Sequence, residues 1–536
     1  MPSYSVVDIF AGPGGLAEGF SNVRGNNGDY AFSIELSIEK EAAAHSTLLL
    51  RSFLRQFNGA IPEAYYNFIN TNAPEPDWSK QFPEEWERAQ SEAWQHELGS
   101  EDATAQLDAR LDQIRTSSND KLILIGGPPC QAYSLVGRAR NHGKKGYVAE
   151  EDDRHFLYKE YIRILDRLQP SAFVMENVKG MLSSTIDGER LIFDQVLEDL
   201  RGDQRHAGKY RLFALCPSPR PRSESETTEP RSRDFVIRAE DFGIPQARHR
   251  VIIIGVREDL ARSVSDRAVA DLIDKRKSEA TVKDAIGGMP ILRSGLSRST
   301  DGPAEWRAVV LSAMKKVSQL DPGLPKAERL QFKSTAKHYL TKFQKMNEIP
   351  PRESDDVGIS NLCSKELTDW LVDEKLTRLA NNQTRGHMAE DLARYFFAAV
   401  FGEVTGRSPK ASNYPDELAP NHKNWSTGKF SDRFRVQLWN AASTTITSHI
   451  SKDGHYFIHP DPLQCRSLSV REAARLQTFP DNYLFKGNRT QQYVQVGNAV
   501  PPLLAKWIGE ALHSILVGNA EKSEEAYKAE EQTNVG

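Results

Sequence analysis

Asp8-Ile9-Phe10-Ala11-Gly12-Pro13-Gly14-Gly15-Leu16 is the stretch of sequence that decides the fold. It extends the apolar run Ser5–Phe10 and leads into a helical pattern, so it predicts a strand, a glycine-rich turn and a helix. Glycines let a ligand approach the backbone closely, and the start of a helix offers free N–H groups. Glu35 ends the next predicted strand, where an acidic side chain can bind ribose hydroxyls. The pattern also fits a nicotinamide site, a flavin site or a purely structural turn.

Further apolar runs alternate with amphipathic stretches along the first half of the chain. The predicted helices are Phe156–Leu168 and Leu191–Leu200, and this alternation is typical of a doubly wound α/β domain with buried parallel strands. The predicted strands after the first one are Tyr30–Glu35, Leu122–Ile125, Ala172–Met175 and Val251–Val256. Two segments depart from the alternation: a polar, helical insertion at about 51–119 and a low-complexity loop at 217–233, which we expect to be mobile.

The bulk composition is that of an ordinary globular protein. The chain has 536 residues, a formal net charge of -4 and four widely spaced cysteines. Such a charge argues against a uniformly basic coat for nucleic acid but allows a local basic cleft. The cysteine spacing predicts neither a disulfide framework nor a metal site. No signal peptide or membrane span is recognisable, so we expect a cytoplasmic protein that contacts no membrane.

A second motif, Gly126-Gly127-Pro128-Pro129-Cys130-Gln131-Ala132-Tyr133-Ser134, follows the predicted strand Leu122–Ile125. Cys130 therefore stands at the carboxyl end of a strand, where open α/β sheets bind their ligands. The two prolines fix the approach of the chain to the cysteine. A lone cysteine is usually an inert buried residue, but the rigid lead-in and the loop position favour a reactive thiol here.

Two further motifs lie near the same predicted edge of the sheet. Glu176-Asn177-Val178 closes the strand Ala172–Met175, so Glu176 can act as an acid, although a helix-capping pair would look the same. Gln246-Ala247-Arg248-His249-Arg250 precedes the strand Val251–Val256. Two arginines at i and i+2 of an extended segment point the same way and can hold anionic or carbonyl oxygens, or form surface ion pairs.

Taken in order, six motifs resemble those of the C5-cytosine-specific DNA methyltransferase family of the bacterial restriction–modification type. They are DIFAGPGG, GGPPCQAYS, ENV, QARHR, RSLSVREAARLQTFP at 466–480 and QVGNAVPP at 495–502. The resemblance covers about residues 3–257 and 464–516. It implies a Rossmann-like, S-adenosylmethionine-dependent methyltransferase domain with a mixed, mostly parallel sheet, plus a separate smaller target recognition domain.

The resemblance also implies domain bounds. Residues 1–285 form the catalytic domain, 286–462 the target recognition domain, and 463–518 a return segment that completes the catalytic domain. The acidic, polar tail at 519–536 is predicted to be disordered.

The same resemblance implies a reaction. Cys130 would add to C6 of a cytosine flipped out of a specific double-stranded DNA sequence, and the methyl group of S-adenosylmethionine would go to C5, without a metal. Glu176 would bind N3 and the amino edge of the base, and Arg250 its O2, with Arg248 in support. The cofactor would lie against Phe10, Gly12, Gly14, Gly15, Leu16, Glu35, Leu36, Pro129, Leu157, Asn498 and Val500.

Target specificity is expected in the block between the motifs, where basic and aromatic side chains suit phosphate contact and base stacking. Arg466, with Arg471, would either contact phosphate or pair with acids inside the fold. The predicted DNA contacts are Gln131, Ser134, Arg385, Lys423, Arg433, Arg435 and Arg466. We expect a monomer on DNA in a bacterial or phage-host nucleoid, with a cognate restriction or phage-defence system as a further partner.

Two alternatives remain at the level of sequence, and two positions depart from the family pattern. The alternatives are an RNA (tRNA) cytosine-C5 methyltransferase, whose variable region is typically smaller, and a catalytically silent DNA-binding relative. The family's acidic residue after the third strand is not identifiable, because the insertion at about 51–119 occupies that stretch. Leu36 stands where many members carry an aromatic residue against the adenine.

Overall fold

The computed structural model describes most of the chain, except for several internal segments and the two ends. The described residues are 4–129, 157–186, 190–201, 210–215, 230–261, 279–354, 356–357, 365–421, 425 and 432–534, without the side chains of 101–103, 185–190 and 519–534. Of the predicted mobile loop, residues 217–229 lie outside this part of the chain.

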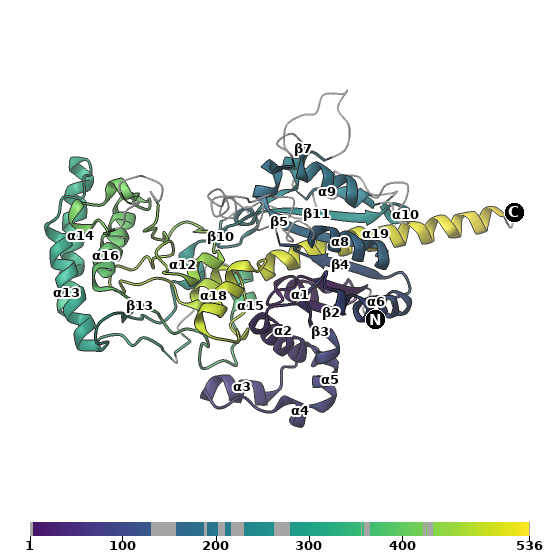
Figure 1. Ribbon diagram of the computed structural model, residues 1–536, viewed down its shortest axis with the longest axis horizontal. Coiled ribbons are helices and arrows are strands. Elements are labelled where there is room, and N and C mark those ends of the chain that lie inside the picture. The colour runs from purple at the N-terminus through teal and green to yellow at the C-terminus, as the bar shows by residue number, and fades with distance from the viewer. Residues whose placement is uncertain are drawn as a thin grey trace.

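A mixed sheet forms the centre of the larger lobe (Figure 1). Its described strands run in the order β3-β2-β1-β4-β5-β11-β8, and β9 pairs with β11 at one end. The bounds of these strands are β1 Tyr4–Ile9, β2 Phe32–Glu39, β3 Ala93–Gln95, β4 Leu122–Gly126, β5 Ala172–Val178, β8 Tyr210–Phe213, β9 Val236–Arg238 and β11 His249–Arg257. The α/β fold with a mixed, mostly parallel sheet is therefore confirmed.

One strand runs against its predicted direction. The strands from β3 to β5 are parallel, whereas β11 is antiparallel to β5, β8 and β9. The prediction that Val251–Val256 is a parallel strand is thus wrong. A parallel strand needs a crossover before it, but the chain enters β11 from β9, which lies antiparallel beside it.

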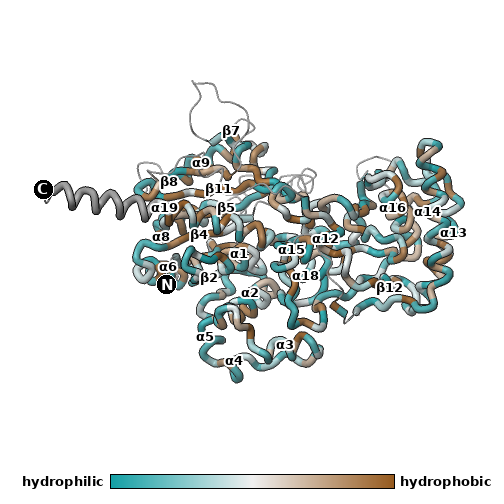
Figure 2. The backbone as a smooth tube through the Cα atoms, turned by 180° about the vertical axis from the view of Figure 1, so that it is seen from behind, coloured by the Kyte–Doolittle hydropathy of each residue, from teal (hydrophilic) through white to brown (hydrophobic). Residues whose placement is uncertain are grey.

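Two helical layers cover the sheet, and hydrophobic residues concentrate along the central strands between them (Figure 2). On one face, α1 and α19 pack against Val6, Ile123 and Ile252. On the other face, α6, α8 and α9 bury Leu124, Phe173 and their neighbours. The helices of these layers are α1 Gly15–Ser21, α6 Glu101–Ser117, α8 Leu157–Leu168, α9 Ile192–Arg201, α10 Glu258–Ala261 and α19 Pro502–Asn534.

The stretch predicted as an insertion is helical, but it also contains part of the sheet. Its helices are α2 Ala42–Arg55, α3 Glu63–Thr71, α4 Trp78–Gln81 and α5 Pro83–Glu92. The edge strand β3 then pairs with Ser37–Glu39 of β2, and α6 covers the same face of the sheet as α8. The insertion as predicted is therefore too long, because its second half supplies a strand and a helix of the central layers.

A second lobe has its own hydrophobic core, built from α13, α14 and α16 around Trp306, Phe397 and Phe401 (Figure 1). The elements in and around it are α13 Pro303–Gln319, α14 Lys326–Gln344, α16 Ala389–Thr405, β12 Gly295–Leu296 and β13 Gly386–His387. The helix between α14 and α16, α15 Lys365–Leu371, packs instead on the core of the larger lobe with α1 and α19. β12 and β13 form a short parallel pair at the side of this lobe that faces the rest of the molecule.

The last part of the chain returns to the larger lobe. Here α12 Val282–Ile286, α17 Val470–Leu476 and α18 Arg489–Asn498 share a core with Phe457 and Phe479. β14 Ser443–Thr444 pairs with β10 Gln246–Ala247, directly before β11. The remaining short strands are β6 Thr185–Ile186 and β7 Arg190–Leu191.

The helix α19 spans Pro502–Asn534, and the expectation that the tail at 519–536 is disordered stays a prediction. This stretch is rich in Ala, Glu and Lys and contains no proline, a composition that favours helix even where polarity suggests disorder. None of the described helices has the length and apolarity needed to cross a membrane.

Candidate active site

The turn between β1 and α1 has one open side and one tightly packed side. Phe10, Gly12 and Gly14 all have positive φ angles, of 57°, 59° and 95°. A Cβ on Gly12 would meet no atom within 4 Å, whereas one on Gly15 would lie 2.4 Å from the carbonyl oxygen of Val500. Phe10 is strained in this region, as residues at ligand sites often are. The open side at Gly12 therefore fits a ligand that approaches the backbone.

The acidic residue at the end of β2 is Glu39 and not Glu35. Its carboxylate accepts a hydrogen bond from the backbone N–H of Gly12 at 2.9 Å and from that of Glu41 at 2.7 Å. Burial raises the pKa of Glu39, and the hydrogen bonds from these two N–H groups partly offset that increase. A carboxylate at the carboxyl end of the second strand, beside the glycine-rich turn, is the arrangement that binds ribose hydroxyls. The prediction that the strand ends at Glu35 is wrong.

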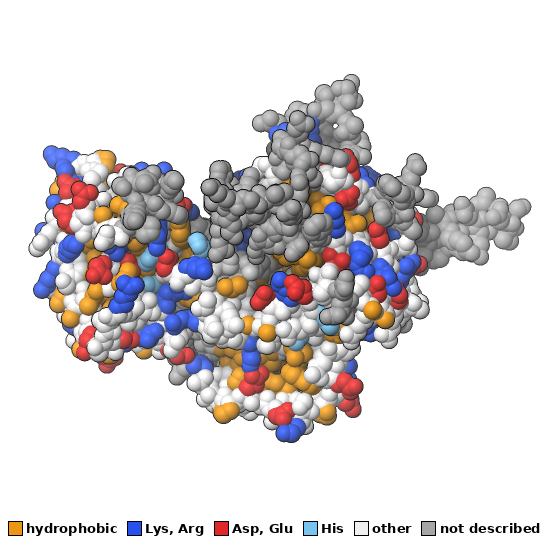
Figure 3. All heavy atoms as spheres, viewed as in Figure 1, with side chains coloured by type: hydrophobic (Ala, Val, Ile, Leu, Met, Phe, Trp, Pro, Cys, Tyr) orange, Lys and Arg blue, Asp and Glu red, His pale blue; other side chains and the backbone are white. Residues whose placement is uncertain are grey.

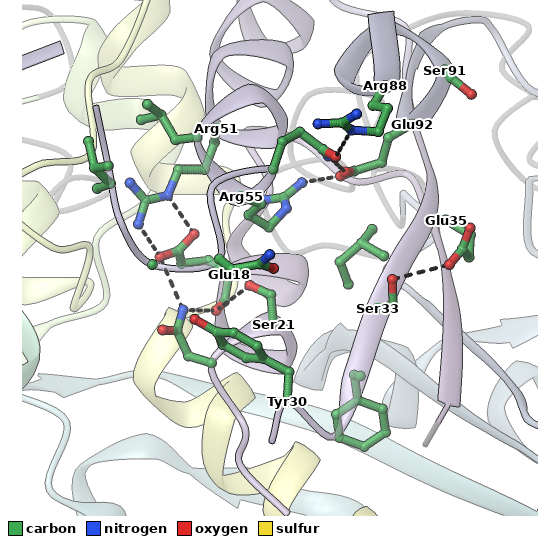
Figure 4. Close-up of a pocket in the computed structure, with 18 of the residues that line it drawn as sticks. Glu18, Ser21, Tyr30, Ser33, Glu35, Arg51, Arg55, Arg88, Ser91 and Glu92 are labelled. Atoms are coloured by element: carbon green, nitrogen blue, oxygen red, sulfur yellow. Dashed lines mark hydrogen bonds and ion pairs between the residues drawn. The ribbon is translucent and has the colours of Figure 1, made fainter. Parts of the chain in front are cut away.

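Glu35 is the extra residue of a β-bulge. Val6 pairs with Ile34 and Val7 with Leu36, so Glu35 has no partner in β1. The extra residue shifts the pairing of the rest of β2 with β1 by one residue. The Glu35 carboxylate accepts a hydrogen bond from the Ser33 hydroxyl at 3.1 Å. It lines a different cavity, of about 1000 Å³, between β2 and the helices of the insertion (Figure 4).

Two other predicted cofactor residues lie inside the fold. Leu36 is fully buried in the core beneath α6 and α8, and Leu16 is buried against α19. Leu36 has no exposed surface to offer a ligand, so its prediction as a cofactor contact is wrong. Both are apolar residues of regular elements, and core packing determines their positions.

The carboxyl ends of β4 and β5 meet at the segment that leads to Cys130. The Asn177 side chain donates to the carbonyl oxygen of Pro128 at 3.3 Å. A Cβ on Gly127 would lie 2.9 Å from Oε2 of Glu176, so glycine is required for this close approach. The chain directly before Cys130 thus runs against Glu176. Cys130 itself lies outside the described residues, as do Gln131 and Ser134.

Glu176 and Arg250 form an ion pair across β5 and β11. Nε of Arg250 lies 2.8 Å from Oε1 of Glu176, and both side chains are largely buried, with 14% and 13% exposed. Burial lowers the pKa of Arg250, and the Glu176 carboxylate opposes that effect. The pair presents a carboxylate and a guanidinium side by side, the donors and acceptors that suit the polar edge of a flat base.

Arg248 is buried and connects the sheet to the return segment. Its Nη1 donates to the carbonyl oxygens of Ile446 at 2.8 Å and of Gly497 at 3.3 Å. Burial, with Arg250 nearby, lowers the pKa of this guanidinium well below its usual range. Arg248 therefore holds the segments around Ile446 and Gly497 in place beside Arg250.

The return segment also supports the glycine-rich turn. Val500 contacts Gly15, while Asn498, two residues earlier, is exposed. The Tyr483 hydroxyl donates to the carbonyl oxygen of Pro13. Leu157 begins α8, and it is half-buried, as is Pro129. Apart from Glu35 and Leu36, the predicted cofactor residues thus come from four segments, at 10–16, 129, 157 and 498–500.

Comparison with known proteins identifies the family. The model of the C-5 cytosine-specific DNA methylase family matches residues 81–514. The chain belongs to this family. It is a DNA (cytosine-5-)-methyltransferase, and the family implies S-adenosylmethionine as methyl donor and DNA as substrate.

Individual relatives match between three quarters and nearly all of the methyltransferase. The type II methyltransferase M.Bpa9945I of Bacillus paralicheniformis is 32% identical over 534 residues, which are 96% of this chain and 99% of the relative. The DNA (cytosine-5-)-methyltransferase M.ApeKI of Aeropyrum pernix is 29% identical over 421 residues, which are 76% of this chain and 84% of the relative. A crystal structure described as a prophage-encoded DNA modification methyltransferase (E. coli) has 20% identity and a TM-score of 0.49 over 96% of this chain and 99% of that one.

Arg466 of the methyltransferase is a structural residue. Its side chain is fully buried and forms two bonds to the Glu472 carboxylate, at 2.6 and 2.7 Å. The prediction of a DNA contact at Arg466 is therefore wrong, and the alternative of an ion pair inside the fold holds. Arg471, equally buried, donates to the carbonyl oxygens of Ala380, Pro480 and Tyr483.

The other predicted DNA contacts differ in exposure. Arg433 pairs with Asp453 at 3.0 Å and Arg435 pairs with Asp432, each with about a third of its side chain exposed. Arg385 is 9% exposed and stacks on a tyrosine ring. Lys423 lies outside the described residues.

Glu39 and Gln246 are the site residues that the sequence reasoning missed. The Gln246 side chain donates to Gln477 at 2.7 Å and accepts from the backbone N–H of Ile446 at 2.7 Å, so it fixes the return segment beside Arg248. Gln246 is the first residue of the QARHR motif, and this position in the motif could have predicted that it belongs to the site. Glu39 could have been found by extending the predicted strand through Ser37-Ile38, which continues its apolar pattern.

Proposed function

We propose that the chain methylates C5 of a flipped-out cytosine in a specific double-stranded DNA sequence through a covalent bond between Cys130 and C6. The observation that carries this proposal is the corner formed by Glu176, Arg250 and the segment Gly127-Pro128 that leads directly to Cys130. A thiol that follows this rigid segment by two residues starts its loop beside the carboxylate and guanidinium that would hold a base.

The reaction needs nucleophilic activation of the base, because cytosine C5 is too weak a nucleophile on its own. The Cys130 thiolate forms a bond to C6, and the electron pair of the C5–C6 double bond moves toward C5. Glu176 hydrogen-bonds N3 and the amino group, and Arg250 donates to O2, so that both stabilise the charge that develops on the ring. After methylation, loss of the C5 proton restores the double bond and expels the Cys130 thiolate.

The turn after β1 fits S-adenosylmethionine, which supplies an electrophilic methyl group when bound. Gly12 leaves the space that a ligand needs, and Glu39 offers the carboxylate for its ribose hydroxyls. Phe10, Gly14, Pro129, Leu157, Asn498 and Val500 would complete the site. Glu39 takes the place that the sequence analysis gave to Glu35.

We infer that the two lobes have different functions. We assign residues 1–285 with 463–518 to catalysis and 286–462 to target recognition, in agreement with the separate core around α13, α14 and α16. Because β14 at 443–444 already pairs with β10, the return to the catalytic lobe begins before residue 463. Arg433 and Arg435, each with about a third of its side chain exposed, are further candidates for DNA contact. We expect the enzyme to act as a monomer alongside a cognate restriction or phage-defence system.

Two experiments in sequence test the proposal. Base-resolution methylation sequencing of DNA from cells that express the protein gives the target sequence. A duplex with 5-fluorocytosine at the target position should then form an adduct that survives SDS, because fluorine cannot leave as a proton does. Cys130→Ser should form no adduct and transfer no methyl group, yet still bind the duplex.

The matched control is Cys216→Ser, which removes a cysteine outside the motif and should leave the adduct intact. Full activity of Cys130→Ser would refute the covalent mechanism. Methylation of RNA in place of duplex DNA would refute the proposed substrate form.

A further inference from the structure

Three arginines converge where the second lobe meets the return segment. Arg352 and Arg489 donate to the same carbonyl oxygen, that of Thr384, at 2.8 and 2.9 Å. Arg385 follows Thr384 directly, and its guanidinium carbon lies 4.5 Å above the ring of Tyr493, one turn after Arg489 on α18. Their cationic groups therefore lie close together, although they come from three separate segments of the chain.

Acidic groups do not balance this cluster. Asp301 pairs with Arg352 at 3.0 Å but is shared with Arg293, which it contacts at 2.7 Å. Within the described residues, no ion pair joins an acid to Arg385 or Arg489. Burial lowers the pKa of Arg489, and so do the neighbouring Arg385 and Arg352. The cluster thus carries an excess of positive charge in a partly dehydrated place.

Arg385 adds the strongest indication of a ligand. Its side chain is nine-tenths buried, yet its Nε has no hydrogen-bond partner, and no hydrogen bond among the described residues uses Nη1 or Nη2. A buried Nε–H without an acceptor is costly, and Nη1 and Nη2, which are not among the buried atoms without a partner, stay open to an acceptor that arrives from the solvent side. Stacking on Tyr493 fixes the plane of the guanidinium, which leaves its N–H groups preorganised for an anion.

The position of the cluster suits an extended polyanion. Lys and Arg side chains gather on the surface between β13 and α18 (Figure 3), the elements that carry or flank Arg385 and Arg489. Guanidinium groups match the geometry of phosphate oxygens with two parallel N–H···O bonds. Arg489 is only half-buried, so a phosphate at the surface can reach it.

We infer that Arg352, Arg385 and Arg489 form a binding site for a backbone phosphate of the DNA substrate. The inference rests on the proposed action on duplex DNA and adds a contact that joins the recognition lobe to the return segment. Such a contact positions the duplex and carries no sequence information.

The test measures the affinity of the full chain for a target duplex, and for a duplex without the target sequence, by fluorescence anisotropy over a range of salt concentrations. One lost phosphate contact reduces the slope of log K against log salt by about 0.9, which is about 3.5-fold in affinity between 50 and 200 mM salt. Arg489→Gln should show this change on both duplexes, and Arg489→Lys should show less of it. Arg329→Gln, an exposed arginine of α14 paired with Asp321, should keep the wild-type slope.

Arg385→Gln should reproduce the effect, and thermal unfolding of each variant checks that it folds. An unchanged slope for Arg489→Gln overturns the inference, as does a change seen only on the target duplex. Inorganic phosphate, added at constant ionic strength, should weaken wild-type binding to DNA more than chloride does, because it competes for the same guanidinium groups, and Arg489→Gln should abolish that difference. Phosphate that binds the wild type but leaves its affinity for DNA unchanged would assign the site to free phosphate and overturn the inference.

These results separate the inference from the catalytic proposal. Formation of the Cys130 adduct with an unchanged salt slope refutes only the phosphate site. A changed slope without the adduct refutes only the covalent mechanism, and a wild-type chain that binds no duplex refutes both.

Discussion

Replacing Arg466 with leucine should unfold the methyltransferase more readily without changing how it contacts DNA. The Glu472 carboxylate beside Arg466 is fully buried. The other side chain near this carboxylate that can carry a positive charge is His459, whose Nε2 lies 3.6 Å from Oε1 of Glu472. Burial raises the pKa of Glu472, but the Arg466 guanidinium outweighs burial and holds that pKa at about 2. Compared with the ordinary value of 4.5, this difference corresponds to about 3 kcal/mol of stability at neutral pH.

The variant leaves Glu472 as a buried charge without its main partner, which typically costs about 3–5 kcal/mol. We expect the free energy of unfolding to fall by about that amount in urea titrations and the Tm to fall by about 5–15 °C. Arg329→Gln is the matched control, because it removes an exposed ion pair worth less than about 1 kcal/mol.

The pH dependence has a definite sign. In the wild type, the depressed pKa of Glu472 gives stability that is present above pH 4.5 and lost as the pH falls toward about 2. In Arg466→Leu, burial without the guanidinium raises that pKa above 4.5. The stability gap between the two proteins should therefore narrow from pH 7 to pH 5. A variant with normal stability but a reduced salt slope of DNA binding would refute this reasoning and restore Arg466 as a phosphate contact.

Two substitutions test the active site. Gly127→Ala should lower kcat at least tenfold while DNA affinity is unchanged, because the new Cβ would lie 2.9 Å from Oε2 of Glu176 and displace that carboxylate. Single-turnover kinetics measure the rate of methyl transfer, and a wild-type rate would contradict the close approach of Gly127 to Glu176. Glu39→Gln should weaken binding of S-adenosylhomocysteine about tenfold in calorimetry, since it removes a charged acceptor of the Gly12 N–H and of the ribose. Glu35→Gln is the control and should bind normally; an equal loss in Glu35→Gln would restore Glu35 as the cofactor residue.

The catalytic corner could be predicted from sequence because its parts stand at strand ends. In a parallel sheet, the carboxyl ends of β4 and β5 necessarily meet, so the segment before Cys130 and Glu176 had to lie close together. Arg250 joined them although β11 proved antiparallel, because its start lies opposite the end of β5. Here topology alone was sufficient.

Local pattern was insufficient where register or burial decides. The bulge at Glu35 moves the end of β2 to Glu39, and a bulge leaves no clear trace in the alternation of apolar residues. Arg466 and Arg489 are both arginines among polar neighbours in sequence. Only the fold shows that the first faces Glu472 in the core and the second faces other arginines near the surface.

The same limit explains why the individual contacts of the return segment could not be predicted. Arg248 donates to carbonyl oxygens about 200 and 250 residues later in the chain, at Ile446 and Gly497. Val500 packs on Gly15, and the Tyr483 hydroxyl bonds to Pro13. The catalytic corner and the cofactor turn are thus held by one segment that also carries Arg489 at its edge. A phosphate bound by Arg489 at the start of α18 would therefore lie one helix away from Val500 and the cofactor turn.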